Sequence, residues 1–330
     1  MQQTIALDRL NHIVDRALYS LGVEEPERSI IRKILMYAEM RGSSQGLIKI
    51  KERTVLPDNN CTDIQIEYKM PSICRIDGGG HTGMYVLQKA VEVVEQCVKT
   101  TGISLVSTHN TRSSTGAIGF YADQLAKSGY IAMVLTGSPK VMAIEGGIDP
   151  VFGTNPVSVA IPTKNSPLVL DMATAATTWF GVINARDSNQ NLPVNTALDA
   201  NGLPTVNPVE AMKGALKAFG GAKGSGLALM FEFLTGVLGN GSLLNDPADN
   251  RSDTVIAIDP EAIEQGFKSR ASDFIEKLKA SRPDQSNNGS GKDGIRLPGE
   301  RSNELAAECL AKNEITVDSR LLEHLTDLAS

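Results

Sequence analysis

The sequence has few of the residues that mark several common classes of protein. Its cysteines, Cys61, Cys74, Cys97 and Cys309, are scattered through 330 residues without a CxxC spacing, which argues against a disulfide framework and a structural zinc site. Its four histidines form no HxH or HExxH pattern, so we expect no metal site. A Gly-x-Ser-x-Gly elbow is also missing, which removes the commonest signal of a serine hydrolase.

Charge and hydropathy argue against two further classes. The formal net charge is −6, so nucleic acid and anionic membranes are not expected partners. No apolar run reaches the ~18 residues that span a bilayer, and the polar, acidic N-terminus does not resemble a secretion signal. We therefore expect a cytoplasmic protein that binds a small-molecule substrate.

The residues that are abundant favour an α/β fold. Hydrophobic residues make up 41% of the chain but aromatic residues only 5%, a balance typical of soluble α/β proteins, in which small side chains let helices lie close to a sheet. The length suffices for two domains, or for one large α/β domain with a helical annex.

Hydrophobic periodicity predicts the order of the elements. Two N-terminal helices, 6–22 and about 25–42, are expected to form a hairpin, followed by short strands at 64–69 and 73–76. From residue 77 strands and helices alternate, which predicts a layered α/β core. The further helices are expected at 82–99, 116–128, 173–186, 207–218, 224–238, 301–312 and 318–328, the further strands at 103–107, 130–136, 157–161, 168–170 and 255–258, and polar loops at 239–253 and 282–294.

Three small, backbone-rich turns follow one another in the middle of the chain. They are Gly153–Pro156, Asp171–Thr174 and Gly220–Gly226, each placed after an apolar strand or before an apolar helix. Such turns let the phosphates and ribose of a dinucleotide approach the backbone closely. They predict a cofactor site assembled from the middle of the chain.

The segment Gly78–Gly83 formally matches the GxGxxG dinucleotide fingerprint after a strand and before a helix. The fingerprint also requires an acidic residue at the end of the next strand, and the sequence there is Ser107-Thr-His-Asn110. We therefore interpret Gly78–Gly83 as a plain glycine turn that lets the helix dock on its strand.

Several ordered motifs, which together extend over nearly the whole chain, resemble one family. It is the malate/L-lactate dehydrogenase family of the non-Rossmann type, which includes ureidoglycolate and sulfolactate dehydrogenases, 2,3-diketogulonate reductase and Δ1-piperideine-2-carboxylate reductase. The motifs are Arg41–Gly46, Gly116–Tyr121, Gly146–Pro156, Leu170–Thr174, Ala197–Thr205, Gly220–Leu229 and Arg296–Gly299.

The resemblance implies a fold and an assembly. It implies an α/β domain whose mixed sheet binds NAD or NADP in the manner of sulfolactate dehydrogenase rather than of a Rossmann fold. It also implies a helical domain built from both chain ends. We expect residues 1–75 and 295–330 to form this terminal domain and residues 76–294 the NAD(P)-binding domain. The family further implies a homodimer with active sites near the subunit contact.

The resemblance also implies the residues that hold the cofactor. Ser138 is expected near the nicotinamide, Lys223 on a phosphate, and Arg301 beside a 2′-phosphate or merely on a helix surface. Thr174 is expected at a helix start, where N–H groups and the helix dipole favour phosphate. Asp171 alone could be a helix cap, and Lys223 a solvated lysine. The full set is Ser138, Asp171, Met172, Ala173, Thr174, Lys223, Gly299, Glu300 and Arg301.

The chain departs from the family where a proton donor is expected. Gln45 and Ser114 stand where most relatives have histidines, and Lys49 stands where they have an arginine for a carboxylate. Reduction of a ketone needs an acid, whereas an iminium substrate already carries its positive charge. These departures favour an imine substrate or a different acid such as Lys140. The candidate catalytic residues are Ser44, Gln45, Lys49, Ser114 and Lys140, unless these side chains only fill turns or remain in solvent.

Two hypotheses for function follow. The first is an NAD(P)H-dependent oxidoreductase that transfers hydride to a small 2-oxo acid or to a 2-imino acid such as a cyclic imine. The second is a relative that kept the nucleotide loops, lost the acid/base pair and now binds a nucleotide or metabolite. His109, close to the site in sequence, could serve as the acid, but we expect its ring to be held by backbone at a strand end.

Overall fold

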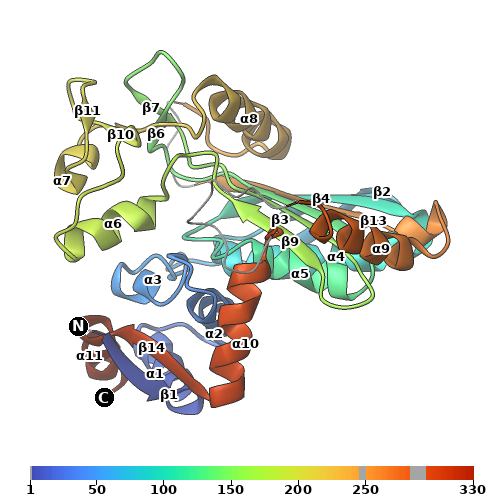
Figure 1. The fold of residues 1–330 in the computed structure, drawn as a ribbon, viewed down its shortest axis with the longest axis horizontal. Coiled ribbons are helices and arrows are strands. Elements are labelled where there is room, and N and C mark those ends of the chain that lie inside the picture. The colour runs from blue at the N-terminus through green and yellow to red at the C-terminus, as the bar shows by residue number, and fades with distance from the viewer. Residues whose placement is uncertain (1, 245–249, 283–294) are drawn as a thin grey trace.

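The computed structural model describes residues 2–244, 250–282 and 295–330 (Figure 1). A long sheet with its covering helices forms one side of the molecule, and a smaller sheet with three helices lies beside one end of it. A third unit combines the two ends of the chain (Figure 1). The expected architecture is confirmed: mixed sheets, and a terminal unit built from both ends.

The long sheet has seven strands in the order β2-β3-β4-β13-β5-β8-β9. Only the β3–β4 pair is parallel, because α4 crosses over between these strands; every other neighbouring pair in this sheet is antiparallel. A Rossmann sheet is parallel, so the pairing agrees with a non-Rossmann fold. The elements are β2 (Gln65–Met70), β3 (Ile73–Asp77), α4 (Gly83–Thr101), β4 (Ile103–Thr111), α5 (Gly119–Lys127), β5 (Ile131–Thr136), β8 (Val157–Ile161), β9 (Leu168–Met172) and β13 (Arg251–Ile258).

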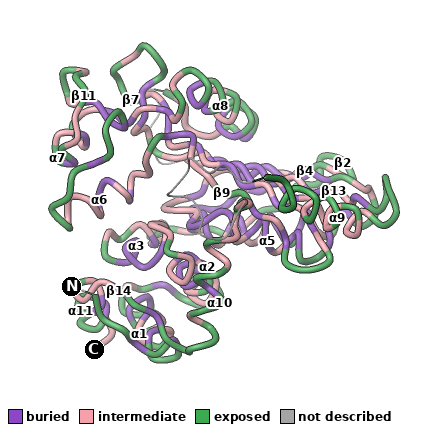
Figure 2. Tube along the Cα trace, in the orientation of Figure 1, coloured by how far each residue is buried: buried purple, intermediate pink, exposed green. Residues whose placement is uncertain are grey.

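The main core lies between this sheet and the helices on one of its faces. Helices α4 and α5 pack on β4, β13, β5 and β8, and their buried apolar residues join those of the sheet in one cluster. Figure 2 shows the buried residues of these elements in purple. Thr82 caps α4 by accepting from the Tyr85 N–H, and Gly102, at φ 73°, ends it. Between these two ends, the helical spacing of the apolar residues determines which face of α4 is buried.

The Gly78–Gly83 turn lies between β3 and α4, but the chain itself covers it. The Thr62 N–H donates to the Gly79 carbonyl, and the Asp58 N–H donates to the Gly80 carbonyl. A Cβ added to Gly79 would lie 2.2 Å from the Thr62 oxygen. The segment around Asp58 and Thr62 therefore occupies the position that a dinucleotide needs, which supports the interpretation as a plain turn.

The terminal unit was predicted as helical, and it also contains a two-stranded antiparallel sheet of β1 and β14. Helix α1 packs against α11, and α2 packs against α10. The elements are β1 (Gln2–Ala6), α1 (Leu7–Ser20), α2 (Glu27–Met40), α3 (Ile48–Lys51), α10 (Glu300–Lys312), β14 (Glu314–Asp318) and α11 (Ser319–Ala329). The domain boundaries stay a prediction, although β2 joins the long sheet before residue 76.

The smaller sheet has the order β11-β10-β12-β6-β7 and lies with α6, α7 and α8. A π-helical turn, Phe233–Val237, continues α8 and packs on β13 and β5. The elements are β6 (Met142–Ala143), β7 (Pro150–Phe152), α6 (Trp179–Asp187), β10 (Ala197–Leu198), β11 (Pro204–Thr205), α7 (Pro208–Ala211), β12 (Ala215–Leu216) and α8 (Ala222–Glu232).

Three of the predicted elements were wrong in extent. The expected helix 207–218 stops at Ala211, because Gly214 packs so closely on the Leu198 carbonyl that a Cβ would lie 2.3 Å from it, and β12 follows. The expected helix 173–186 begins only at Trp179. The expected loop 239–253 contains the start of β13, where polar residues pair with β4.

Two predicted loops lie partly outside the described residues. The predicted loop at 282–294 lies almost entirely outside the described residues, as do 245–249 of the other loop. Helix α9 (Phe267–Lys279) was not predicted. Within the described parts of the chain, no helix is both long enough and apolar enough to cross a bilayer.

Candidate functional site

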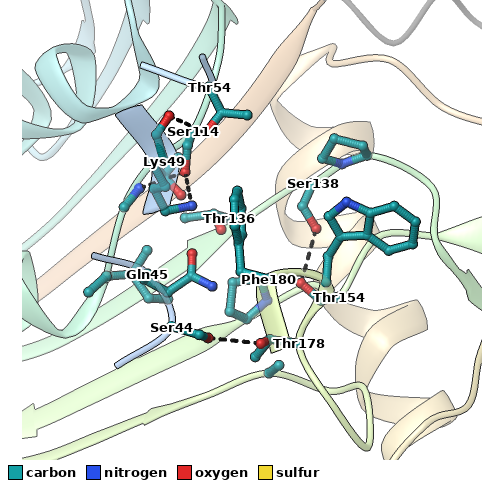
Figure 3. Close-up of a pocket in the computed structure, with 18 of the residues that line it drawn as sticks. Ser44, Gln45, Lys49, Thr54, Ser114, Thr136, Ser138, Thr154, Thr178 and Phe180 are labelled. Atoms are coloured by element: carbon teal, nitrogen blue, oxygen red, sulfur yellow. Dashed lines mark hydrogen bonds between the residues drawn. The ribbon is translucent and has the colours of Figure 1, made fainter. Parts of the chain in front are cut away.

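A cavity of about 430 Å³ opens between α3, the turn from β4 to α5, the ends of β5 and β9, and the start of α6 (Figure 3). This volume is within the range of small-molecule sites. The cavity brings together eight residues that the sequence predicted from separate motifs. They are Ser44, Gln45, Lys49 and Ser114 from the catalytic set, and Ser138, Asp171, Met172 and Ala173 from the cofactor set.

Lys49, on α3, is 1% exposed, and its amine lies at the cavity wall. Its Nζ donates to Ser114 Oγ at 2.7 Å and lies 3.7 Å from the centre of the Phe180 ring. Among the described residues no carboxylate lies within 4 Å of Nζ. Burial, with a smaller contribution from the Arg251 charge, holds the pKa of Lys49 well below its usual 10.5.

Ser114 lies in the turn between β4 and α5, directly beside that amine (Figure 3). Its backbone N–H donates to the Thr54 carbonyl, which fixes the turn. Its Oγ accepts from Lys49 Nζ and also, at 3.1 Å, from the Gly116 N–H. Gly116 has φ 72°, and a Cβ there would lie 2.5 Å from the Ile34 side chain, so the turn requires glycine.

Ser44 and Gln45 reach the cavity from the segment between α2 and α3. Ser44 Oγ lies 2.9 Å from Thr178 Oγ1, and Thr178 in turn caps α6 by accepting from the Gly181 N–H. A side chain at position 46 would collide with Glu39, because a Cβ on Gly46 would lie 2.1 Å from the Glu39 carboxylate. The same carboxylate accepts a hydrogen bond from the Leu47 N–H. The Ser-Gln-Gly element is thus fixed by a partly buried glutamate.

The opposite wall is built by the end of β5 with the residues that follow it, and by the segment that leads into β8 (Figure 3). Ser138 Oγ lies 3.4 Å from Thr154 Oγ1. A Cβ on Gly153 would lie 2.2 Å from Ser138 Oγ, so these two segments meet only because residue 153 is glycine. Asn155 is fully buried and donates to the Ala228 carbonyl and to Glu232, which ties this wall to α8.

Asp171 lines the cavity at the end of β9, where it is an exposed residue whose carboxylate is partly desolvated by the protein around it. Its Oδ2 accepts from the Gly119 N–H, the first of α5, at 2.8 Å. Poor solvation raises its pKa to about 6, although this hydrogen bond opposes the shift. It is therefore both a cap of α5 and a carboxylate that a ligand can reach.

The physical argument for Thr174 was wrong, because no helix begins there. Thr174 is fully buried outside the cavity lining, and its N–H and hydroxyl both donate to the Thr154 carbonyl. Its own carbonyl accepts from the Phe219 N–H, just before α8. The helix N-terminus in this region belongs to α8, and Lys223 is exposed in its first turn.

The remaining predicted residues lie outside the cavity lining. Gly299 is the N-cap of α10, and Glu300 and Arg301 follow in its first turn. Gly299 and Arg301 line a separate surface hollow, next to Arg41 and Arg296. Lys140 donates from its amine to the Leu243 carbonyl at 2.6 Å and does not line the cavity.

The sequence reasoning missed several residues that line the cavity. Arg251 lies at the start of β13, in a stretch predicted as loop, and its guanidinium donates to the Ser113 carbonyl. Trp179 and Phe180 add aromatic surface from α6. The only tryptophan in the chain follows closely after Asp171–Thr174, which could have drawn attention to it. No local signal indicates Arg251, because it is remote in sequence from every motif.

His109 is held as expected at the end of β4. Its Nδ1 lies 3.0 Å from the Ile76 carbonyl, and it does not line the cavity. Burial lowers the pKa of its imidazole. In the described part of the chain, no cluster of three or more histidine, cysteine or acidic side chains is arranged to hold a metal ion.

Comparison with known sequences assigns the family. Residues 5–326 match the malate/L-lactate dehydrogenase family. The malate/(S)-sulfolactate dehydrogenase of Methanothermus fervidus is 31% identical, over 96% of this chain and 94% of the relative. The (2R)-3-sulfolactate dehydrogenase (NADP(+)) of Chromohalobacter salexigens is 28% identical over 93% of each chain. The ureidoglycolate dehydrogenase (NAD(+)) of Escherichia coli is 27% identical, over 71% of this chain and 68% of the relative.

Solved structures agree with these sequences. Malate dehydrogenase from Pyrococcus horikoshii superposes with a TM-score of 0.86 at 29% identity, covering 99% of this chain and 95% of that structure. The resemblance inferred from the motifs and the expected nicotinamide cofactor are thereby confirmed at the level of the family. The chain belongs to the malate/L-lactate dehydrogenase family, and it is a dehydrogenase whose relatives use NAD(+) or NADP(+).

Proposed function

We propose that this protein is an NAD(P)H-dependent oxidoreductase that transfers hydride to a small 2-oxo acid or 2-imino acid. The observation that carries the proposal is the shared cavity: Lys49 and Ser114 line one side of it, and Ser138 and Asp171 line others. Residues that the family resemblance separates into a catalytic set and a cofactor set thus meet around one space of ligand size.

The residues present fit a nicotinamide dinucleotide. Thr136 lines the cavity, and its buried Oγ1 has no hydrogen-bond partner within the described structure, so a polar ligand group can satisfy it. Gly220 and Gly221, both at positive φ, leave open backbone ahead of α8 beside the Thr174 turn. Asp171 is suited to the ribose hydroxyls, and Lys223 with the first N–H groups of α8 to phosphate. When bound, the nicotinamide ring supplies or accepts the hydride.

The substrate class follows from the charges and size of the cavity. Arg251 and Lys49 bring two basic groups to its wall, and a guanidinium holds a carboxylate by two parallel hydrogen bonds. Trp179 and Phe180 add apolar wall to the cavity, whose volume of about 430 Å³ suits a small ligand. The names of the curated relatives, which include malate, sulfolactate and ureidoglycolate dehydrogenases, support a small acid as well.

The direct test is cofactor oxidation by the purified protein. We expect NADH or NADPH to be consumed with a panel of 2-oxo acids, cyclic imines, and keto acids plus methylamine. Calorimetry with each cofactor alone runs beside the assay. Cofactor binding without turnover of any panel member would instead support the nucleotide-binding alternative, and no binding at all would exclude both.

The choice of coenzyme is proposed to favour NADPH. Arg41, Arg296 and Arg301 line one surface hollow at the start of α10, and the segment after Arg41 continues into the cavity wall at Ser43. Three guanidinium groups match the charge of a 2′-phosphate. Substitution Arg301→Ala should weaken NADPH binding about 10- to 100-fold, since such a bond is worth about 1.5–3 kcal/mol, and leave NADH binding unchanged. An unchanged NADPH affinity would remove this role.

We further propose that the protein is a homodimer that uses the outer face of α8 and of the π-helical turn that continues it. Six large apolar side chains on this face are 40–53% exposed: Leu227, Met230, Phe233, Leu234, Val237 and Leu238. Glu232, the only charged residue between 224 and 244, accepts from Asn155 instead of facing outward. A face without charge can pair with its own copy about a twofold axis. Substitution Phe233→Glu should yield a monomer in analytical ultracentrifugation, whereas Phe274→Glu, an exposed change on α9, should not.

The imine class remains part of the proposal because the two family histidines are absent. A protonated imine needs only a carboxylate anchor and exclusion of water. The relative rates with 2-oxo acids and with cyclic imines therefore distinguish the two substrate types.

A further inference from the structure

We propose that Ser114 and Lys49 form a two-residue proton relay, in which the Ser114 hydroxyl exchanges its proton with the substrate oxygen and Lys49 exchanges that proton with Ser114. This inference rests on the proposed function and names the groups that replace the missing histidines.

The first step is the hydrogen bonding of the Ser114 hydroxyl. A hydroxyl has two acceptor sites and one donor. Both acceptor sites of Ser114 Oγ are occupied, by Lys49 Nζ at 2.7 Å and by the Gly116 N–H at 3.1 Å. Its own O–H must therefore point away from both groups. Because Ser114 lines the cavity, that proton is available to a bound substrate.

The second step is the isolation of the Lys49 amine. A fully buried lysine is rare unless it is paired, and this one has no carboxylate within 4 Å among the described side chains. The groups around it are Ser114 from the β4–α5 turn, the Phe180 ring from α6 and the Arg251 cation from β13. Glu52 and Asp171 line the same cavity. Desolvation and Arg251 lower the pKa of Lys49, which makes its neutral form accessible.

The third step is the balance of the reaction. During reduction of a 2-oxo acid the carbonyl carbon gains hydride from the reduced dinucleotide, and the electrons of the C–O π bond move to oxygen. The Ser114 O–H bond breaks as its proton passes to that oxygen. A proton from the Lys49 ammonium forms a new O–H bond on Ser114. Lys49 is left as a neutral amine and regains its proton from solvent after the product leaves.

The reverse reaction uses the same groups in the opposite sense. Neutral Lys49 takes the proton of Ser114, while Ser114 takes the proton of the substrate hydroxyl. Reduction therefore requires the protonated amine and slows as pH rises through the lowered pKa of Lys49. Oxidation requires the neutral amine and slows as pH falls through it.

The main experiment compares Lys49→Met with a matched control, Lys51→Met. Lys51 is on the same helix, but it is exposed and paired with Asp187 at 2.6 Å. We expect Lys49→Met to lower kcat for 2-oxo acid reduction by about 10²–10⁴, with KM changed less and the pH-dependent limb removed. Lys51→Met should retain both kcat and the limb. A Lys49→Met enzyme that keeps kcat and the limb would overturn the relay.

Two additional variants separate proton transfer from structure. Ser114→Ala should lose kcat to a similar degree, whereas Ser114→Thr, which keeps the hydroxyl, should recover part of it. Added trimethylamine, which as a tertiary amine cannot convert the oxo acid into an imine substrate, should restore turnover of Lys49→Ala in proportion to its concentration. Two results would contradict proton transfer and indicate a positioning role. One is that the variants raise KM without lowering kcat. The other is that the added amine does not rescue Lys49→Ala while Ser114→Ala and Ser114→Thr are equally active.

A readout without turnover keeps the relay separate from the proposed function. Protein labelled with ¹³C at lysine Cε should give one NMR resonance that is missing in Lys49→Met and that titrates well below 10.5. In Ser114→Ala its pKa should fall further, because the ammonium loses its acceptor. A normal titration would refute the relay even in an active enzyme. With the expected titration but no oxidation of either cofactor by the wild-type protein, the proposed function fails and the relay fails with it.

Discussion

Lys49 and Asp253 are both buried and have no opposite charge within ion-pairing distance among the described residues, and they differ in what lies next to them. Lys49 opens onto the cavity, whereas Asp253 is fully buried near the start of β13 and does not line it. Asp253 accepts from Thr108 Oγ1, but its Oδ1 has no hydrogen-bond partner in the described structure. Both groups pay for desolvation, yet only Lys49 can exchange a proton with a ligand.

The comparison teaches how to separate a functional perturbation from a structural one. Burial raises the pKa of Asp253 to about 7 and lowers the pKa of Lys49. The cause is the same in both cases, because burial favours the neutral form of an acid and of a base. The difference lies in access: a shifted group is useful for proton transfer only where a substrate can touch it or its partner. Four predictions test this distinction, and each concerns a group with a different degree of exposure.

The largest effect is expected for Asp253→Asn. The folded-state pKa is about 7 and the ordinary value is 3.8, so the folded protein binds more protons than the unfolded chain between these values, and the free energy of unfolding falls as pH rises. The isosteric amide does not titrate and removes this loss. As pH rises from 4 to 8, the free energy of unfolding of the variant should therefore increase relative to that of the wild type by on the order of 4 kcal/mol. Denaturant unfolding at both pH values measures the gain. Equal pH dependence in both proteins would show that Asp253 is well solvated.

Lys49→Met is expected to stabilise the fold while strongly lowering kcat. The folded-state pKa is below 10.5, so between the two values the unfolded chain binds more protons and wild-type stability rises with pH. Below this window the cost of a buried ammonium is fully present, and replacing it with a thioether should gain about 1–3 kcal/mol. Thermal unfolding from pH 6 to 10 should show a difference that narrows at high pH. A less stable variant would mean that the amine contributes more through its contacts than its burial costs.

Asp171 differs from both buried groups, because it is an exposed residue that opens onto the cavity. Its pKa is about 6, and ribose hydroxyls bind the ionised form as donors. Cofactor affinity should therefore fall about tenfold for each pH unit below 6, as fluorescence titration of NADPH can measure. Asp171→Asn should give a flat profile, while Asp63→Asn, at an exposed position outside the cavity, should retain the slope. A slope that survives in Asp171→Asn would assign it to another group.

The smallest effect is expected for the exposed pair of Lys51 and Asp187. Their Nζ and Oδ2 atoms are 2.6 Å apart, but the side chains are 37% and 23% exposed. Water screens such pairs, so Lys51→Met should change the free energy of unfolding by less than about 1 kcal/mol. A double-mutant cycle with Asp187→Asn measures the coupling. A coupling as large as the effect at Asp253 would show that exposure does not decide these energies.

Local sequence signals predicted much of the fold, and their failures have local causes. The helices at both chain ends and the main strands were predicted because each has a clear apolar period. The helix expected at 207–218 was wrong because Gly214 must pack on the Leu198 backbone, a contact that no local pattern records. Residues 251–253 read as loop because their polar side chains pair inside a sheet whose partners lie more than a hundred residues away.

The candidate site was only partly predictable for a related reason. Gln45, Ser114 and Asp171 were found because they lie in motifs, and the structure brings them to one cavity. Arg251 was missed because it lies in no motif. Thr174 was assigned to the start of a helix, but that helix begins five residues later, at Trp179. Motifs identify segments with special backbone needs, but they do not indicate which side chains of other segments face them.

The sequence alone determined the family, the kind of cofactor and the absence of both expected histidines, because these depend on residue identities in order along the chain. Tertiary structure decided that Lys49 is buried, that its amine meets Ser114 and that Arg251 lies nearby. The physical reason is that pKa values and proton paths depend on solvent access and on distances between segments, which are set when α3, the β4–α5 turn and β13 pack together.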